Sequence, residues 1–188
     1  MDLKSKKPAL LLIDIQLGLD EWDYYGGNRN NLRAEYNAAK ILQEWRLLAL
    51  PVYHVKHSSQ NPDSPLHVSK PGFEIKEEVR PQKDEMVITK TENSAFIGND
   101  LEQQLHNANI STLVVVGLTT NHCVSTSVRM ASNLGFETFL IADATATFDR
   151  VGINGETFDA ELVHQTTLAS LNEEFATILT TDLLLSAL

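Results

Sequence analysis

The sequence contains a single cysteine, Cys123, in the run Gly117-Leu-Thr-Thr-Asn-His-Cys-Val124 between a predicted strand and a predicted helix. The unpaired N–H groups of a helix N-terminus favour the reactive thiolate form and can hold a developing oxyanion. The commoner fate of a free cysteine is burial as a small hydrophobic residue. Its position nevertheless makes Cys123 a candidate nucleophile.

Three further residues are candidates for acid–base chemistry. Asp14 follows the apolar run 10–13, at the strand end where α/β enzymes place catalytic groups, although a turn or cap carboxylate is an equal alternative. Lys90 follows a third predicted strand, and a lone lysine is usually a solvated surface residue. His122 directly precedes Cys123, but neighbouring helix residues point about 100° apart. We therefore expect Asp14, not His122, to be the base.

Short apolar runs alternate with stretches of helical period, which predicts how these residues are positioned. Strands are predicted at 10–13, 52–55, 86–88, 113–116, 136–141 and 176–179, and helices at 32–48, 101–108, 123–134 and 157–171, with a closing helix after them. Continuous apolar strands separated by helices indicate a three-layer α/β/α fold with a doubly wound, mainly parallel six-stranded sheet. Ligands bind beyond the carboxyl ends of such strands.

The segment 58–85 is the one long irregular connection, and it holds four of the six prolines. So long a connection is uncommon in a compact domain unless it forms a lid or a binding loop. We expect this segment and the loop at 20–30 to determine specificity.

Bulk properties limit the function classes. A length of 188 residues suits a single domain spanning 1–188, and a net charge of −10 argues against a nucleic-acid partner. One cysteine cannot form an internal disulfide, and no segment approaches the roughly 20 apolar residues of a membrane span. We expect a cytoplasmic location and no membrane contact. Glycine-rich dinucleotide, phosphate-loop and serine-elbow motifs are absent, so no cofactor is expected.

The order of Asp14, Lys90 and Cys123 resembles the isochorismatase-like superfamily of cysteine hydrolases. The resemblance covers nearly the whole chain, through Leu11–Gln16, Lys90–Gly98, Gly117–Val124, Ala131-x-x-x-Gly135, Ala142-Asp143-Ala144, Phe175-Ala176 and Thr181-Asp182. Each piece is loose, but the order and spacing of all of them are specific.

The resemblance implies a catalytic triad. In it Asp14 takes the proton from Cys123 and later delivers it to the leaving nitrogen, while Lys90 keeps both partners ionised and oriented. It also implies a cis peptide between Leu118 and Thr119, which would aim the Thr119 N–H, with that of Cys123, at an oxyanion.

Departures from the family pattern bear on metal and substrate. Nicotinamidases of this superfamily carry an Asp-x-His metal pair after the second strand, where this chain has His57 and Ser59. We therefore expect no metal, and two histidines near that strand end, His54 and His57, are weak evidence for one. The candidate substrate contacts are Gln16, Trp22, Tyr24, Tyr25, His57 and Phe96.

Three functions stay open at this point. The leading hypothesis is a metal-independent hydrolase that cleaves an amide, carbamoyl or ureido C–N bond of a small molecule. The second is an isochorismatase-type vinyl-ether hydrolase in which Cys123 is incidental, and the third is a non-catalytic binding or scaffold protein of the same fold. The resemblance also implies a homo-oligomer, a dimer or larger.

Overall fold

The computed structural model describes residues 3–188, and its centre is a parallel sheet of six strands in the order β3-β2-β1-β4-β5-β8. The strands of this sheet are β1 (Ala9–Ile13), β2 (Val52–His57), β3 (Met86–Lys90), β4 (Thr112–Leu118), β5 (Glu137–Ala146) and β8 (Thr177–Leu179). The helices are α1 (Trp22–Tyr25), α2 (Ala34–Leu47), α3 (Leu101–Asn107), α4 (Ser125–Asn133), α5 (Ala160–Leu171) and α6 (Thr181–Ser186). The predicted α/β fold is confirmed.

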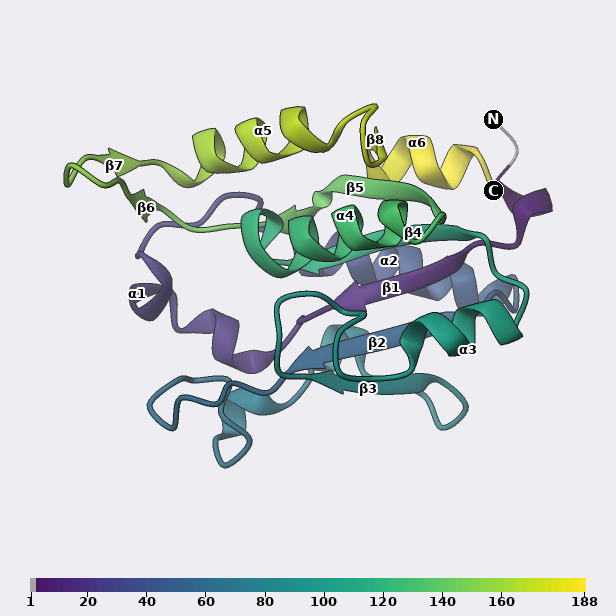
Figure 1. Cartoon of the computed structure of the whole chain (residues 1–188), viewed down its shortest axis with the longest axis horizontal. Coiled ribbons are helices and arrows are strands. Elements are labelled where there is room, and N and C mark those ends of the chain that lie inside the picture. The colour runs from purple at the N-terminus through teal and green to yellow at the C-terminus, as the bar shows by residue number, and fades with distance from the viewer. Residues whose placement is uncertain (1–2) are drawn as a thin grey trace.

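Two apolar layers cover the two faces of the sheet because the central strands are buried on both sides. On one face, Leu10 and Leu12 of β1 pack with Ile41 and Trp45 of α2, and α6 joins the same cluster. On the other face, Leu11 of β1 packs in a cluster with side chains of α3, α4 and α5. Figure 1 shows α2 behind the sheet, with α3 and α4 in front of it.

The strand register brings the candidate residues to one edge of the sheet. Ile13 at the end of β1 pairs with Gly117 of β4 on one side and with Val55 of β2 on the other. His57 at the end of β2 pairs with Lys90 at the end of β3. Because the strands are parallel, these four carboxyl ends meet at the same edge.

Several elements differ from their predicted bounds by a few residues, and three of the differences bear on the site. β3 extends to Lys90, and β5 continues to Ala146 with a register shift against β4 between Val115 and Gly117. The helix predicted from residue 157 begins at Ala160, because the Asp159 carboxylate accepts the Leu162 N–H as an N-cap at 2.8 Å. The residues before this cap form β7 (Thr157–Phe158), which pairs antiparallel with β6 (Arg150–Val151) in a hairpin that the sequence analysis missed.

The segment 58–85 folds back against the end of the sheet. It contains two short 3₁₀ turns at Pro71–Phe73 and Glu77–Val79, and Ile75 forms an isolated bridge with Gln16. The Gln16 side chain fixes this arrangement, because its amide donates to the carbonyls of His57 and Phe73 and accepts the His57 N–H. The segment is thus an ordered wall beside the carboxyl end of β1.

A buried ion network ties this wall to α2. Glu35 of α2 accepts hydrogen bonds from both ends of the Arg29 guanidinium at 2.8 and 2.6 Å and from Lys76 at 2.7 Å. Lys76 also pairs with Asp20 at 2.5 Å. Burial alone would raise the pKa of Glu35, but the bonds from Arg29 and Lys76 lower it to about 2.

Glu35→Gln is expected to destabilise the fold by about 3–5 kcal/mol at neutral pH, because two buried cations lose their shared partner. A lowered carboxyl pKa stabilises the folded state above the unfolded pKa of about 4.3, and this contribution is lost as pH falls toward about 2. The difference between wild type and variant should therefore shrink over that range, measured by urea unfolding. Asp182→Asn, which breaks a surface pair with Lys40, is the control and should cost less than about 1 kcal/mol. An equal cost for both variants would contradict the assignment.

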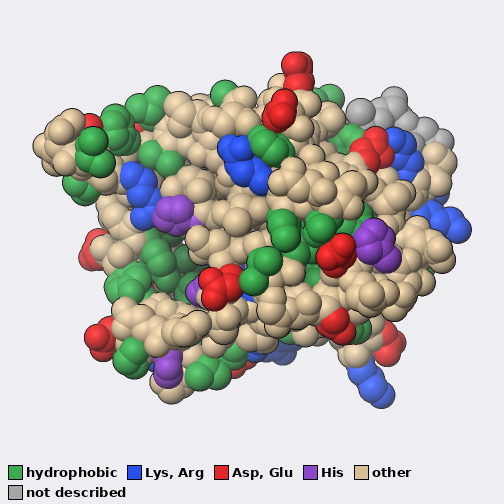
Figure 2. All heavy atoms as spheres, viewed as in Figure 1, with side chains coloured by type: hydrophobic (Ala, Val, Ile, Leu, Met, Phe, Trp, Pro, Cys, Tyr) green, Lys and Arg blue, Asp and Glu red, His purple; other side chains and the backbone are tan. Residues whose placement is uncertain are grey.

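On the face of the molecule shown in Figure 2, the acidic residues do not form a single patch. Their side chains are spread over that face. Within residues 3–188, no helix is both long and apolar enough to cross a bilayer.

Candidate active site

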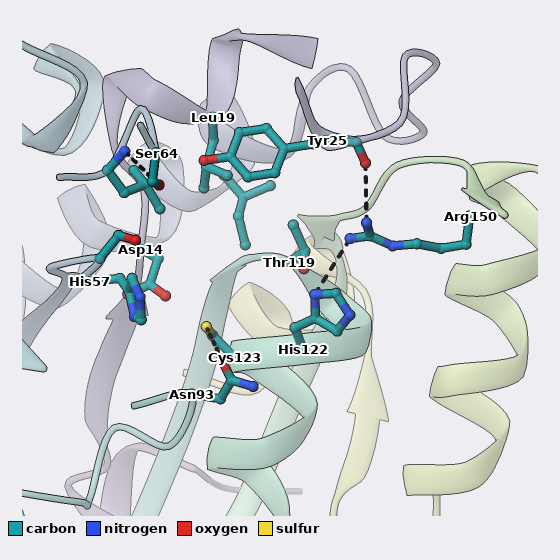
Figure 3. Close-up of a pocket in the computed structure, with 13 residues that line it drawn as sticks. Asp14, Leu19, Tyr25, His57, Ser64, Asn93, Thr119, His122, Cys123 and Arg150 are labelled. Carbon is teal, nitrogen blue, oxygen red and sulfur yellow. Dashed lines mark hydrogen bonds between the residues drawn. The ribbon is translucent and has the colours of Figure 1, made fainter. Parts of the chain in front are cut away.

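A cavity of about 160 Å³ opens beyond the carboxyl ends of β1, β2 and β4. Its lining comes from the strand ends and from the connections that follow them (Figure 3): Asp14, Leu19, Tyr25, His57, Ser59, Ser64, Leu66, Asn93, Leu118, Thr119, His122, Cys123 and Arg150. Pockets for drug-sized molecules run from roughly 300 to 1,000 Å³. This cavity therefore suits a small molecule.

The ammonium of Lys90 joins the candidate catalytic residues. Its Nζ atom donates to Oδ2 of Asp14 at 2.7 Å, to Nδ1 of His57 at 3.1 Å and to Sγ of Cys123 at 3.3 Å. An ammonium has three donors, and all three are used here. The side chain of Lys90 is fully buried, which its hydrogen bonds and its ion pair with Asp14 make tolerable.

Asp14 presents its second carboxylate oxygen without a partner. Oδ1 is buried and has no hydrogen-bond partner within the part of the chain that the structure describes. The residue adopts a φ of 51°, in the left-handed region that costs an ordinary L-residue about 1–2 kcal/mol, although aspartate tolerates it better than most. Its backbone N–H donates to Val55, which holds it against the end of β2. Oδ1 can therefore act as an acceptor for the thiol of Cys123, which lines the same cavity.

Burial and two neighbouring charges act on the pKa of the Cys123 thiol. Burial raises its pKa well above the ordinary value, and the charge of Asp14 raises it further, while Lys90 partly offsets both. The direction of this shift is opposite to the lowered thiol pKa predicted from a helix N-terminus, because the sulfur is buried and stands beside the carboxylate of Asp14. If the proton moves from Cys123 to Asp14, the total charge of the cluster does not change, whereas its release to water would leave an extra buried negative charge.

Cys123 lies in a π-helical turn, Thr120–Val124, that leads directly into α4. The Thr119 carbonyl accepts both the His122 and the Val124 N–H, at 3.1 and 3.2 Å. The peptide bond between Leu118 and Thr119 is cis, at the position that the resemblance indicated. Its role in an oxyanion hole stays a prediction.

Close contact between β1 and β4 fixes the relative position of Asp14 and this turn. Gly117 has a φ of 126°, and a Cβ atom there would lie 2.0 Å from the carbonyl oxygen of Ile13. No residue larger than glycine fits without moving the backbone of β1. At the start of the turn, the side chains of Thr120 and His164 hydrogen-bond at 2.9 Å, which anchors the turn to α5.

A metal ion has little room among these ligands. Asp14, His57 and Cys123 place potential ligand atoms within 4.8 Å of one another, a set that could hold a cation. However, Lys90 Nζ already contacts all three side chains, so an ammonium stands where a metal would bind. Burial and Lys90 lower the pKa of His57, which fits a neutral imidazole that accepts at Nδ1. Ser59, the other position of the family's metal pair, lines the cavity but does not join this cluster.

The predicted substrate contacts separate into two groups. His57 and Tyr25 line the cavity. Gln16 does not, because its amide is engaged by backbone groups behind the cavity wall. Phe96 stacks on Phe136 in the core, and Trp22 and Tyr24 are exposed and line a separate shallow hollow.

Several lining residues were missed or underrated. Arg150, the first residue of β6, reaches the cavity from the base of the β6–β7 hairpin, and Ser64 and Leu66 reach it from the segment 58–85. His122, discounted as a base, lines the cavity and accepts from Arg150 at Nδ1 over 3.4 Å. Burial and the charge of Arg150 lower the pKa of His122. Asn93 lies beside the thiol, 3.7 Å from Oδ1 to Sγ.

Comparison with known proteins gives consistent results. The isochorismatase domain model matches residues 8–182. The isochorismatase family protein YrdC of Bacillus subtilis is 48% identical over 97% of this chain and 96% of its own. A crystal structure described as a hydrolase of the isochorismatase family, from Chromobacterium violaceum, superposes with a TM-score of 0.94 at 40% identity, covering 100% of this chain and 96% of that one. Nicotinamidase 3 of Arabidopsis thaliana is 28% identical over 96% of this chain and 88% of its own.

Proposed function

We propose that this chain, which belongs to the isochorismatase family of hydrolases, cleaves a C–N bond of a small amide, carbamoyl or ureido compound with Cys123 as its nucleophile. The observation that carries the proposal is the Lys90 ammonium, which hydrogen-bonds both Asp14 and Cys123 while Oδ1 of Asp14 stays free. A relative that carries the name nicotinamidase supports an amide as the substrate class.

In the first half of the reaction, the thiol of Cys123 attacks the carbonyl carbon while its proton passes to Asp14. The C–S bond forms, and the carbonyl oxygen takes up negative charge beside the backbone N–H groups of Thr119 and Cys123. When the tetrahedral intermediate collapses, the C–N bond breaks and Asp14 returns the proton to the departing nitrogen. The products of this half are a free amine or ammonia and a thioester at Cys123.

In the second half, Asp14 takes a proton from water, and the resulting hydroxide attacks the thioester carbon. The C–S bond breaks, the acid leaves, and the proton from Asp14 restores the thiol. Lys90 exchanges no proton in this scheme; its ammonium holds Asp14 and the sulfur in place and offsets negative charge on either of them. The cavity volume of about 160 Å³ limits the acyl group to a small one.

The test is a screen for ammonia or amine release from a panel of small primary amides and carbamoyl compounds. A substrate that turns over should give an intact-mass increase equal to its acyl group after rapid acid quench. Because the chain has one cysteine, peptide mapping should place the adduct on Cys123. Turnover without any adduct, persisting in Cys123→Ser, would contradict the thiol mechanism.

A further inference from the structure

Arg150 enters the cavity from the side opposite the triad. Figure 3 shows its guanidinium between Tyr25 and His122, across the cavity from Asp14 and His57. One terminal nitrogen donates to the backbone carbonyl of Tyr25 at 3.1 Å and the other reaches Nδ1 of His122 at 3.4 Å. The Nε atom is buried and has no partner among residues 3–188.

This guanidinium lacks the carboxylate that Arg29 and Arg46 possess, and it also lacks the aromatic ring on which Arg129 stacks. Arg29 pairs with Glu35 at 2.6 Å and Arg46 pairs with Glu85 at 2.7 Å. Within the described residues, no carboxylate forms an ion pair with Arg150. A partly buried charge without a counter-ion is costly, so its persistence at a cavity wall indicates a partner from outside the chain.

The other charged groups of the cavity do not supply that partner. The negative charge of Asp14 is met by the ammonium of Lys90 at 2.7 Å. His122 offers no negative charge, and burial and Arg150 lower its pKa. The cavity therefore carries one uncompensated positive charge, in a chain whose net charge is −10.

A structural role alone does not account for the geometry. The bond to Tyr25 ties the β6–β7 hairpin to α1, but it uses one of five guanidinium donors. His122 uses a second donor with a long, weak contact. Three donors, one of them on the buried Nε, have no partner among residues 3–188, and the planar end of a guanidinium matches the two oxygens of a carboxylate. In Figure 2, basic and histidine side chains lie beside hydrophobic ones at the hollow below the β6–β7 hairpin, on the left of the view.

We propose that Arg150 binds a carboxylate of the substrate, so that the compound hydrolysed is a small amide or ureide with an acidic group at its far end. This inference rests on the proposed function for the identity of the scissile bond. The side chains of Leu19, Tyr25 and Leu66 line the same cavity, so an apolar spacer can join the two polar ends.

The test is equilibrium binding by calorimetry to Cys123→Ala, which cannot turn the ligand over. The probes are malonamate, succinamate and glutaramate, each paired with the primary amide in which a methyl group replaces the carboxylate. At least one acidic probe should bind about tenfold or more tightly than its uncharged partner, as expected for a charged hydrogen bond. This comparison needs no change at Arg150, so a folding defect cannot obscure it.

Variants in the same background then assign the preference. Arg150→Met should reduce it to less than about threefold, and Arg150→Lys should retain part of it as a point charge. Arg129→Met is the matched control, because the Arg129 guanidinium stacks on Phe175 away from the cavity. It should leave the preference unchanged.

Two results would overturn the proposal: no acidic probe preferred over its partner, or a preference that survives in Arg150→Met. Failure of the proposed function has a different signature. In that case the acidic probes bind in an Arg150-dependent manner, but wild-type protein releases no ammonia and forms no adduct at Cys123.

Discussion

Cys123→Ala is expected to lower kcat/KM for amide cleavage by about 10⁴–10⁶-fold, as removal of a covalent nucleophile does in other hydrolases. No second thiol exists to replace it, because the chain has one cysteine. Cys123→Ser should be nearly as inactive, since a hydroxyl is much harder to ionise than a thiol. Steady-state kinetics on whichever amide the screen identifies provide the measurement.

The control for this loss is structural. Cys123 is half-buried and packs at the margin of a core cluster, so deletion of its sulfur should cost about 1 kcal/mol of stability. Ser132→Ala, on the helix α4 that follows the Cys123 turn and outside the cavity, should keep full activity. Residual activity in Cys123→Ala above one percent of wild type would exclude the thioester route.

Asp14→Asn is expected to make the Cys123 thiol easier to ionise and at the same time to slow turnover. The charge of Asp14 is one cause of the raised thiol pKa, after burial, so its removal should lower that pKa. Turnover should nevertheless fall by about 10²–10⁴-fold, because asparagine cannot carry the proton between sulfur and leaving nitrogen. Ultraviolet absorbance of the thiolate, titrated against pH with Cys123→Ala as the blank, measures the ionisation directly.

Lys90→Met is the opposing control, since Lys90 lowers the thiol pKa. It should raise that pKa and also reduce turnover. If Asp14→Asn and Lys90→Met shift the thiol pKa in opposite directions and both lose turnover, then turnover is limited by proton transfer and not by the amount of thiolate. An Asp14→Asn variant within threefold of wild-type activity would refute the assignment of the base.

Substitutions at Asp14 and Cys123 also discriminate between the alternative functions. A vinyl-ether hydrolase of this fold would lose activity in Asp14→Asn and keep it in Cys123→Ala. A non-catalytic scaffold would release no product from any compound in the panel and would form no adduct at Cys123. The double dependence on Asp14 and Cys123 is specific to the thiol mechanism.

The sheet could be predicted from local patterns in the sequence, whereas the grouping of Asp14, Lys90 and Cys123 was implied by the family resemblance. Continuous apolar runs identify parallel strands, and polar residues just after them must meet at one edge. Asp14 follows β1, Lys90 ends β3 and Cys123 lies in the turn after β4, and the strand order of the structure brings these three positions together. The length of β5 and the start of α5 depend on a register shift and a single cap.

The far wall of the cavity could not be predicted, because its residues are positioned by long-range contacts. In α1 the aromatic residues at 22, 24 and 25 differ by about 100° per position, and the contact of Tyr25 with Phe148 decides which one faces inward. Arg150 stands on a strand of two residues, too short for any periodic signal. Phe96 follows β3 in the sequence, where a cavity residue is expected, but its ring packs against Phe136 and not into the cavity.

The cavity wall has two origins: Asp14 and Cys123 lie just after the ends of packed strands, whereas Leu19, Tyr25, Ser64, Leu66 and Arg150 stand on connections outside the main sheet. The strand-end residues and the residues on the connections can therefore change independently during evolution. A side chain at Gly117 would displace the backbone of β1 next to Asp14, whereas a changed connection would alter only the far wall of the cavity. Such a scaffold can diversify across lineages by exchanging loops while the chemistry at its centre is preserved.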